Sequence, residues 1–81
     1  MLNSVEQIEG ELVNIVYKEF LKRFDGNKSK FAIASLCSET TVRRVFNNKQ
    51  RMTVDLLLRF CNALQIDVVE LFKEAKKNFK K

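Results

Sequence analysis

The sequence predicts an all-α fold made of five short helices. The chain has 81 residues with no proline and only two glycines, and it is 46% hydrophobic and 31% charged. A β-sandwich or barrel of this length needs many turns built on glycine and proline, and these residues are almost absent. The length suits one domain and is too short for two. We therefore expect a single domain over residues 1–81 with short connections.

The first two helices are delimited by recognisable start and stop signals. Ser4–Gln7 (SVEQ) has the form of a capping box, and apolar residues recur behind it at helical spacing as far as Phe24. Residues 25–27 (Asp-Gly-Asn) break this helix. A second helix is expected to begin near Lys28 or Ser29.

The last three helices have caps of the same kind. Ser38 is expected to cap a third helix, with Asn48 in the left-handed conformation after its end. Residues 48–52 form a polar, basic loop, Thr53 caps a fourth helix, and a capping-box pattern at 67–70 opens a fifth. The predicted apolar positions are Val54, Leu57, Leu58, Cys61 and Leu64 in the fourth helix, and Val68, Leu71, Phe72, Ala75 and Phe79 in the fifth.

Positive charge is concentrated in the middle of the chain. The whole chain has a net charge of +5. Residues 28–52 contain six basic residues and one acidic residue, Glu39, whereas residues 1–27 are net acidic. This distribution favours a polyanionic partner, the alternative being a basic surface that is merely solvated.

Several functions are disfavoured by residues that are missing. The chain has no histidine, and its two cysteines, Cys37 and Cys61, form no C-x-x-C pair. We expect both thiols in the core, although a disulfide between them stays open. We expect no cofactor, no metal ion and no enzymatic activity. Without a signal-peptide pattern or a long apolar run, the chain is expected to be cytoplasmic, with no membrane contact.

The segment 28–47 has the spacing of a helix-turn-helix. Ala32 is small where two helices must approach closely, and Val42 lies ten residues later, facing back toward it. Val45 follows one turn on, and Phe31 and Cys37 complete the inner face. In such a motif the second helix protrudes and can enter a major groove.

At these positions the sequence resembles the Cro/CI family of helix-turn-helix regulators, also called lambda-repressor-like or XRE. The resemblance covers a core at 13–72, with 73–81 as a basic helix end or tail. It rests on Ala32, Ser38, Thr41, Val42, Val45, Asn47, Thr53, Leu57, Phe60, Cys61, Ala63, Leu64, Ile66, Val68, Leu71 and Phe72. It implies a compact five-helix DNA-binding domain, a bacterial or phage transcription regulator such as a repressor, and a recognition helix at 39–47.

Two residues depart from the family pattern. Leu36 stands where the family favours a glycine, so the turn must be strained, altered or reached by a longer helix. Phe46 stands where many members have a glutamate that pairs with an arginine of the first helix, so we expect Arg23 to lack that partner.

The candidate DNA contacts are the polar residues on the outward face of the predicted recognition helix and the residues that flank this helix. Residues expected to contact bases are Glu39, Thr40, Arg43, Arg44 and Asn47. Residues expected to contact phosphates are Lys28, Ser29, Lys30, Ser38, Asn48, Lys49, Gln50 and Arg51. Glu39 can accept from cytosine or orient Arg43 four residues later.

The expected partner is double-stranded DNA with a palindromic operator, bound by a homodimer. Val68, Phe72 and Phe79 are candidate dimer contacts, and Ile8 and Leu12 offer a rival surface. The alternative function is a protein-interaction module on the same scaffold, of the antitoxin or anti-repressor type. The acidic first helix and the apolar last helix would then be its working surfaces.

Overall fold

The five predicted helices are all present in the fold. The computed structural model describes residues 3–79, with side chains described for residues 5–78. The helices are α1 (Asn3–Phe24), α2 (Lys28–Ser35), α3 (Glu39–Phe46), α4 (Val54–Leu64) and α5 (Val68–Phe79). No strand occurs among the described residues, and the predicted all-α fold is confirmed.

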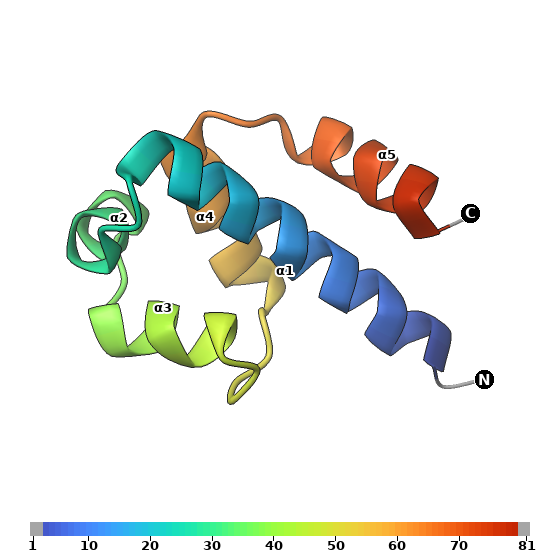
Figure 1. Cartoon of the computed structure of the whole chain (residues 1–81), viewed down its shortest axis with the longest axis horizontal. Helices are drawn as coiled ribbons and strands as arrows, with labels where there is room; N and C mark the ends of the chain where they lie inside the picture. The colour runs from blue at the N-terminus through green and yellow to red at the C-terminus, as the bar shows by residue number, and fades with distance from the viewer. Residues whose placement is uncertain (1–2, 80–81) are drawn as a thin grey trace.

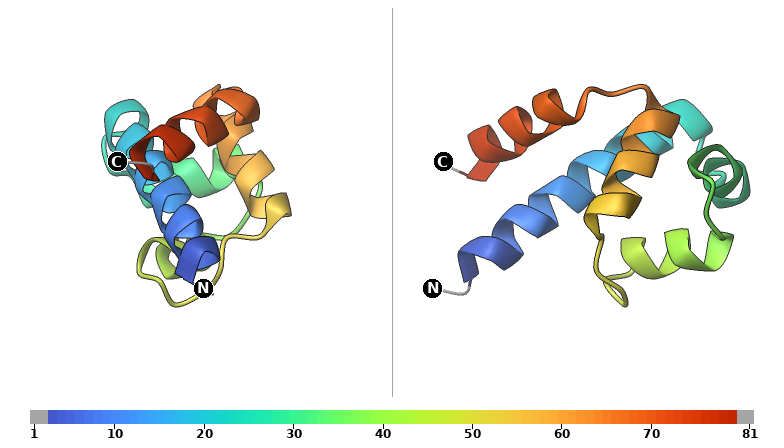
Figure 2. Two further views of the ribbon diagram at one scale, coloured as in Figure 1. Left: turned by 90° about the vertical axis from the view of Figure 1, so that its right-hand side faces the viewer. Right: turned by 180° about the vertical axis from the view of Figure 1, so that it is seen from behind.

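Helix α1 is the axis around which the other helices are arranged (Figure 1). It contacts α2, α3, α4 and α5, and its most extensive packing is against α5. The short helices α2, α3 and α4 gather around the C-terminal part of α1, while α5 returns along it, as the two views of Figure 2 show. The N-terminal part of α1 extends beyond the α2–α4 cluster.

A cluster of aromatic rings ties α1, α2, α3 and α4 together. Phe20, Phe31 and Phe60 are fully buried, and the Phe31 ring centroid lies 5.1 Å from that of Phe20 and 5.0 Å from that of Phe60. Phe46 joins from α3, with its ring 5.1 Å from Phe20. Such pairs contribute about 0.5–1.5 kcal/mol each beyond their burial. The cluster therefore fixes α3 against the rest of the domain.

Two N-caps predicted from the sequence are confirmed. The Oγ of Ser38 accepts a hydrogen bond from the amide of Thr41 at 3.1 Å, at the start of α3. The Oγ1 of Thr53 accepts from the amide of Leu56 at 3.2 Å, at the start of α4. Each cap satisfies a backbone donor that the helix leaves unpaired.

The predicted start of the first helix is wrong. Helix α1 already includes Asn3, so Ser4 lies inside the helix and cannot be its N-cap. The pattern at Ser4–Gln7 indicated a helix correctly and misplaced its first residue, because helix ends are the least well-defined part of such a pattern.

The predicted buried face of the fourth helix is also partly wrong. Val54 and Leu58 are 71% and 49% exposed, whereas Leu56 and Phe60 are buried. The other predicted positions, Leu57, Cys61 and Leu64, are buried as expected. The Phe60 ring belongs to the aromatic cluster, and α4 therefore turns the side that carries Leu56 and Phe60 inward.

Cys37 and Cys61 are both free thiols, so the alternative of a disulfide between them is wrong for this structure. Cys61 is buried and Cys37 half-buried. Burial raises the pKa of both thiols, which keeps them protonated and makes them poor nucleophiles.

Candidate nucleic-acid interface

The turn between α2 and α3 contains a leucine in the left-handed conformation. Leu36 has φ 58° and ψ 43°, and its side chain is 75% exposed. Its amide donates to the carbonyl oxygen of Ile33, and the Cys37 amide donates to that of Ala32 at 3.0 Å. Of the three outcomes expected at this position, the structure has the strained one. A left-handed non-glycine residue costs roughly 1–2 kcal/mol.

Helix α4 supports this turn. The Nη1 of Arg59 donates to the carbonyl oxygen of Leu36 at 2.9 Å, and its Nε is 2.8 Å from Oδ2 of Asp55. Sequence reasoning missed this contact. The spacing of Asp55 and Arg59 indicates an ion pair within one helix, but it does not point to the carbonyl of Leu36.

Helix α3 has a buried valine face and an exposed polar face. Val42 and Val45 are buried. The five residues predicted to contact bases are all exposed, four on α3 and Asn47 as its C-cap: Glu39, Thr40, Arg43, Arg44 and Asn47. Helix α3 ends at Phe46, one residue short of the predicted range. These side chains are therefore accessible to a binding partner.

The two neighbouring arginines of α3 differ in their partners. The Nη2 of Arg43 lies 2.7 Å from Oε2 of Glu39, four residues earlier. Arg44 has no ion pair within the described part of the chain. Glu39 thus orients Arg43, one of the two roles considered for it, while Arg44 carries an uncompensated charge.

The start of α2 lies on one side of this surface. Asn27 is the N-cap of α2, and its Oδ1 accepts from the amide of Lys30 at 3.0 Å. Ser29 and Lys30 are exposed, and Lys28 is half-buried. Ser38, another predicted phosphate contact, is exposed, and its hydroxyl lies 2.9 Å from that of Thr41. A bound phosphate would have to share the Ser38 hydroxyl with that contact.

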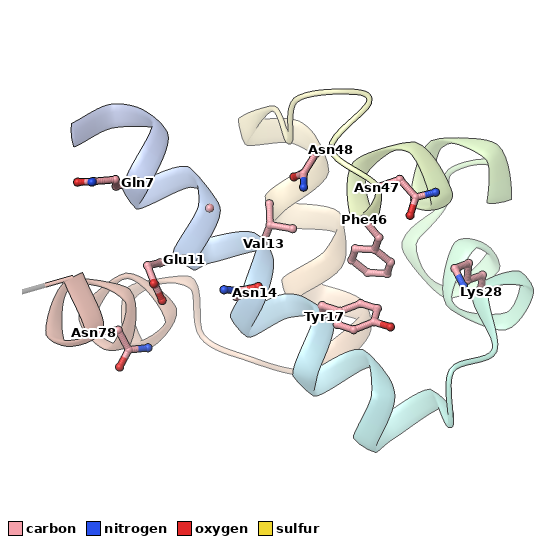
Figure 3. A pocket seen from close by; sticks show the side chains of 11 residues that line it. Gln7, Glu11, Val13, Asn14, Tyr17, Lys28, Phe46, Asn47, Asn48 and Asn78 are labelled. Carbon is pink, nitrogen blue, oxygen red and sulfur yellow. The ribbon is translucent and has the colours of Figure 1, made fainter. Parts of the chain in front are cut away.

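An open hollow of about 830 Å³ separates the N-terminal part of α1 from the end of α3. Figure 3 shows the rings of Tyr17 and Phe46 close together in its lining, which also includes Lys28, Asn47 and Asn48. The Tyr17 and Phe46 rings meet edge to face, with centroids 5.0 Å apart. Phe46 therefore joins α3 to α1 by aromatic packing, at the position where the resemblance implied a glutamate in an ion pair.

The arginine expected to lack a partner on α3 has one on its own helix. The Nε of Arg23 lies 3.1 Å from Oε1 of Glu19.

The loop after α3 is tied to α1. Arg51 donates to Oε1 of Glu9 from Nη2 at 2.9 Å and from Nε at 3.2 Å. The other carboxylate oxygen, Oε2, accepts from the amide of Met52 at 3.3 Å. The hydrogen bond from Arg51 holds the pKa of Glu9 below its usual range, against the effect of burial. Sequence reasoning missed this contact because 42 residues separate the two side chains.

The other predicted phosphate contacts in this loop are accessible to different degrees. Asn48 has φ 59°, which confirms the predicted left-handed conformation. Asn48 and Lys49 are exposed, and Gln50 is half-buried. With Arg51 they form a short rim of polar groups beside the end of α3.

The surfaces considered for dimer contacts lie away from α3. On α5, Phe72 is exposed and Val68 half-buried, and the side chain of Phe79 lies outside the described residues. On the rival surface Ile8 is half-buried and Leu12 is buried, so Leu12 offers no free contact.

The described residues contain no group of three His, Cys, Asp or Glu residues that could hold a metal ion. Among them, no helix is both long and apolar enough to cross a membrane.

The chain matches the model of a known protein family. The model of the Cro/C1-type HTH DNA-binding domain matches residues 18–75, well over half of the chain. The match contains α2, α3 and α4 completely and leaves out the first fifteen residues of α1, Asn3–Tyr17. Neither the curated proteins nor the solved structures include a match to the chain.

Proposed function

The chain belongs to the family of Cro/C1-type HTH DNA-binding domains, and on that premise we propose that it is a sequence-specific transcription regulator. The family match supports DNA binding by a helix-turn-helix regulator. We further propose that residues 39–47 enter the major groove of double-stranded DNA and read its bases.

The observation that carries this proposal is the two-sided character of α3. Its valines anchor it in the core while Arg43 and Arg44 project from the surface. An arginine can hold O6 and N7 of guanine with two parallel hydrogen bonds, worth about 1–3 kcal/mol of discrimination. Arg44 is the stronger candidate for this role, because Arg43 is already paired with Glu39.

Phosphate contacts would flank the recognition segment on both sides. Lys28, Ser29 and Lys30 lie at the N-terminus of α2, where backbone amides favour an anion. Ser38 caps α3, and Asn48, Lys49, Gln50 and Arg51 follow it. Contacts of this kind fix the register of the protein on the duplex and add affinity without reading sequence.

A homodimer on a palindromic operator would place two copies of α3 about 34 Å apart, one helical turn of DNA. The exposed Phe72 and the half-buried Val68 on α5 support this proposal. Phe79, whose side chain lies outside the described residues, is the third proposed contact.

Selection of bound duplexes from a random pool tests the proposal. We expect enrichment of one sequence with two inverted half-sites, bound more tightly than a scrambled duplex at the same salt concentration. Equal recovery of all sequences would refute sequence-specific reading and leave only non-specific electrostatic binding.

The exposed Val69 and Phe72 of α5 favour one alternative, a protein-interaction module of the antitoxin or anti-repressor type. The two functions differ in their response to salt. Phosphate contacts make the logarithm of the DNA affinity fall steeply with the logarithm of salt concentration. Failure to bind any duplex at low salt would favour the interaction module.

A further inference from the structure

The N-terminal part of α1 lies outside the family match but touches the candidate interface. The match begins at residue 18, and Glu9 lies nine residues earlier on the same helix, about two and a half turns away. Its carboxylate reaches the loop that follows α3. An acidic group therefore lies where the proposed function needs cationic groups to meet phosphates.

The contact uses the part of Arg51 best suited to an oxyanion. Both Nε and Nη2 donate to the same oxygen of Glu9. This edge of a guanidinium is the one that holds carboxylate or phosphate oxygens with paired hydrogen bonds. The arginine side chain remains 70% exposed, whereas that of Glu9 is 25% exposed. A phosphate can approach Arg51 from solvent, but it meets a competing carboxylate there.

The surroundings strengthen this competition. A hollow of about 480 Å³ beside the pair is lined by Glu6 and Glu9 from α1, and by Lys49 and Arg51 from the loop. Two carboxylates thus face the two basic side chains of the loop. Exposed ion pairs of this kind are weak, so an incoming phosphate can displace one.

We propose that Glu9 sets the DNA affinity of this chain by standing in for a backbone phosphate on Arg51. In the free protein the Glu9 carboxylate holds the Nε–Nη2 edge. In the complex, Arg51 exchanges that carboxylate for a phosphate oxygen of the duplex. The proposal rests on the proposed function, since it requires the loop after α3 to meet the DNA backbone.

The exchange has a measurable consequence. When Arg51 moves to a phosphate, cations leave the DNA. The freed Glu9 carboxylate in turn attracts cations from solution, which offsets part of that release. The net release of ions is therefore smaller than for an arginine without an internal partner, and the salt dependence is shallower. Removing the Glu9 charge should strengthen binding to every duplex and steepen that dependence.

The substitution Glu9→Gln separates charge from shape. Glutamine keeps the length of the side chain and an oxygen that can accept from the Met52 amide, so the loop keeps its backbone anchor. The matched control is Glu11→Gln, which removes the same charge from the same helix. Within the described residues Glu11 makes no ion pair. Both changes are also made in an Arg51→Gln background.

The measurement is the affinity of the full chain for a selected and a scrambled duplex over a series of salt concentrations. We expect Glu9→Gln to bind both duplexes about two- to fivefold more tightly per protomer than Glu11→Gln. The log–log salt slope should steepen by up to about 0.9 per protomer. In the Arg51→Gln background the two variants should be equal.

Each other result has a definite meaning. Equal affinities of Glu9→Gln and Glu11→Gln with Arg51 intact would overturn the inference and leave the proposed function standing. Weaker binding by Glu9→Gln would also overturn it and make Glu9 a brace for the loop. If the unmodified chain binds no duplex at low salt, the proposed function fails and the inference fails with it.

Discussion

Arg59 of α4 donates a hydrogen bond from Nη1 to the carbonyl oxygen of Leu36, at 2.9 Å. Leu36 is the residue that reverses the chain between α2 and α3, and it does so at φ 58°. The guanidinium thus holds a strained turn against the helix behind it, with Asp55 orienting the arginine at 2.8 Å. The angle at which α3 projects therefore depends on α4 as well as on the turn.

The strain at this turn can be removed by one substitution. We expect Leu36→Gly to stabilise the fold by on the order of 0.5–1 kcal/mol, because glycine adopts positive φ at no steric cost. The gain is reduced by the greater freedom of glycine in the unfolded chain. The Leu36 side chain is mostly exposed, so little burial is lost. Urea denaturation measures the change.

Ile33→Gly is the matched control for that variant. Ile33 is similarly exposed but lies inside α2 and has no positive φ. Glycine there should destabilise the fold by about 0.5–1 kcal/mol. A loss of stability in both variants would mean that the left-handed leucine is not under strain.

A second stabilising change lies in the core. Ser35 is buried, and its Oγ has no hydrogen-bond partner in the described part of the chain. A buried hydroxyl without a partner costs about 1–3 kcal/mol, and alanine is also the better helix former. We expect Ser35→Ala to raise the unfolding free energy by about 1 kcal/mol. The exposed Ser29→Ala should change it by less than about 0.5 kcal/mol.

The two kinds of proposed DNA contact should respond differently to truncation. Arg44→Ala is expected to cost about 1–3 kcal/mol on the selected duplex and to relax the preference at one base pair of each half-site. Lys49→Ala should weaken selected and scrambled duplexes alike and reduce the salt slope by about 1 per protomer. Competition binding with single-base variants of the selected site distinguishes the two patterns. Identical losses for both variants would argue against base reading by Arg44.

The features that the sequence predicted well are governed by neighbours in the chain. Ser38 and Thr53 cap their helices through amides three residues away, so the local sequence contains both partners. Val42 and Val45 belong to a short helix with one apolar face, which leaves little choice about what is buried. Together these local rules also placed the exposed arginines of α3.

The features that could not be predicted from the sequence depend on tertiary packing. Helix α4 has apolar residues on more than one face, and the choice of Leu56 and Phe60 over Val54 and Leu58 is made by the aromatic cluster. The contact between Glu9 and Arg51 joins segments 42 residues apart, and neither side chain stands in a periodic pattern that points to the other. The distribution of charge along the sequence shows an acidic and a basic segment, but it does not predict which residues of the two segments pair.

The Glu9–Arg51 contact also makes fold stability depend on pH. The pKa of Glu9 is lowered in the folded chain, mainly by the hydrogen bond from Arg51, although burial acts in the opposite direction. A carboxyl whose folded pKa lies below its unfolded value adds stability that is present above the unfolded pKa, about 4.3. That contribution is lost as the pH falls through the folded pKa.

We therefore expect the stability difference between the unmodified chain and Glu9→Gln to be constant near pH 7 and to shrink below about pH 4.5. Urea denaturation of both chains from pH 7 to pH 3 measures this difference, with Glu11→Gln as the control. A difference that stays the same down to pH 3 would mean that Glu9 gains nothing from Arg51 in the folded state.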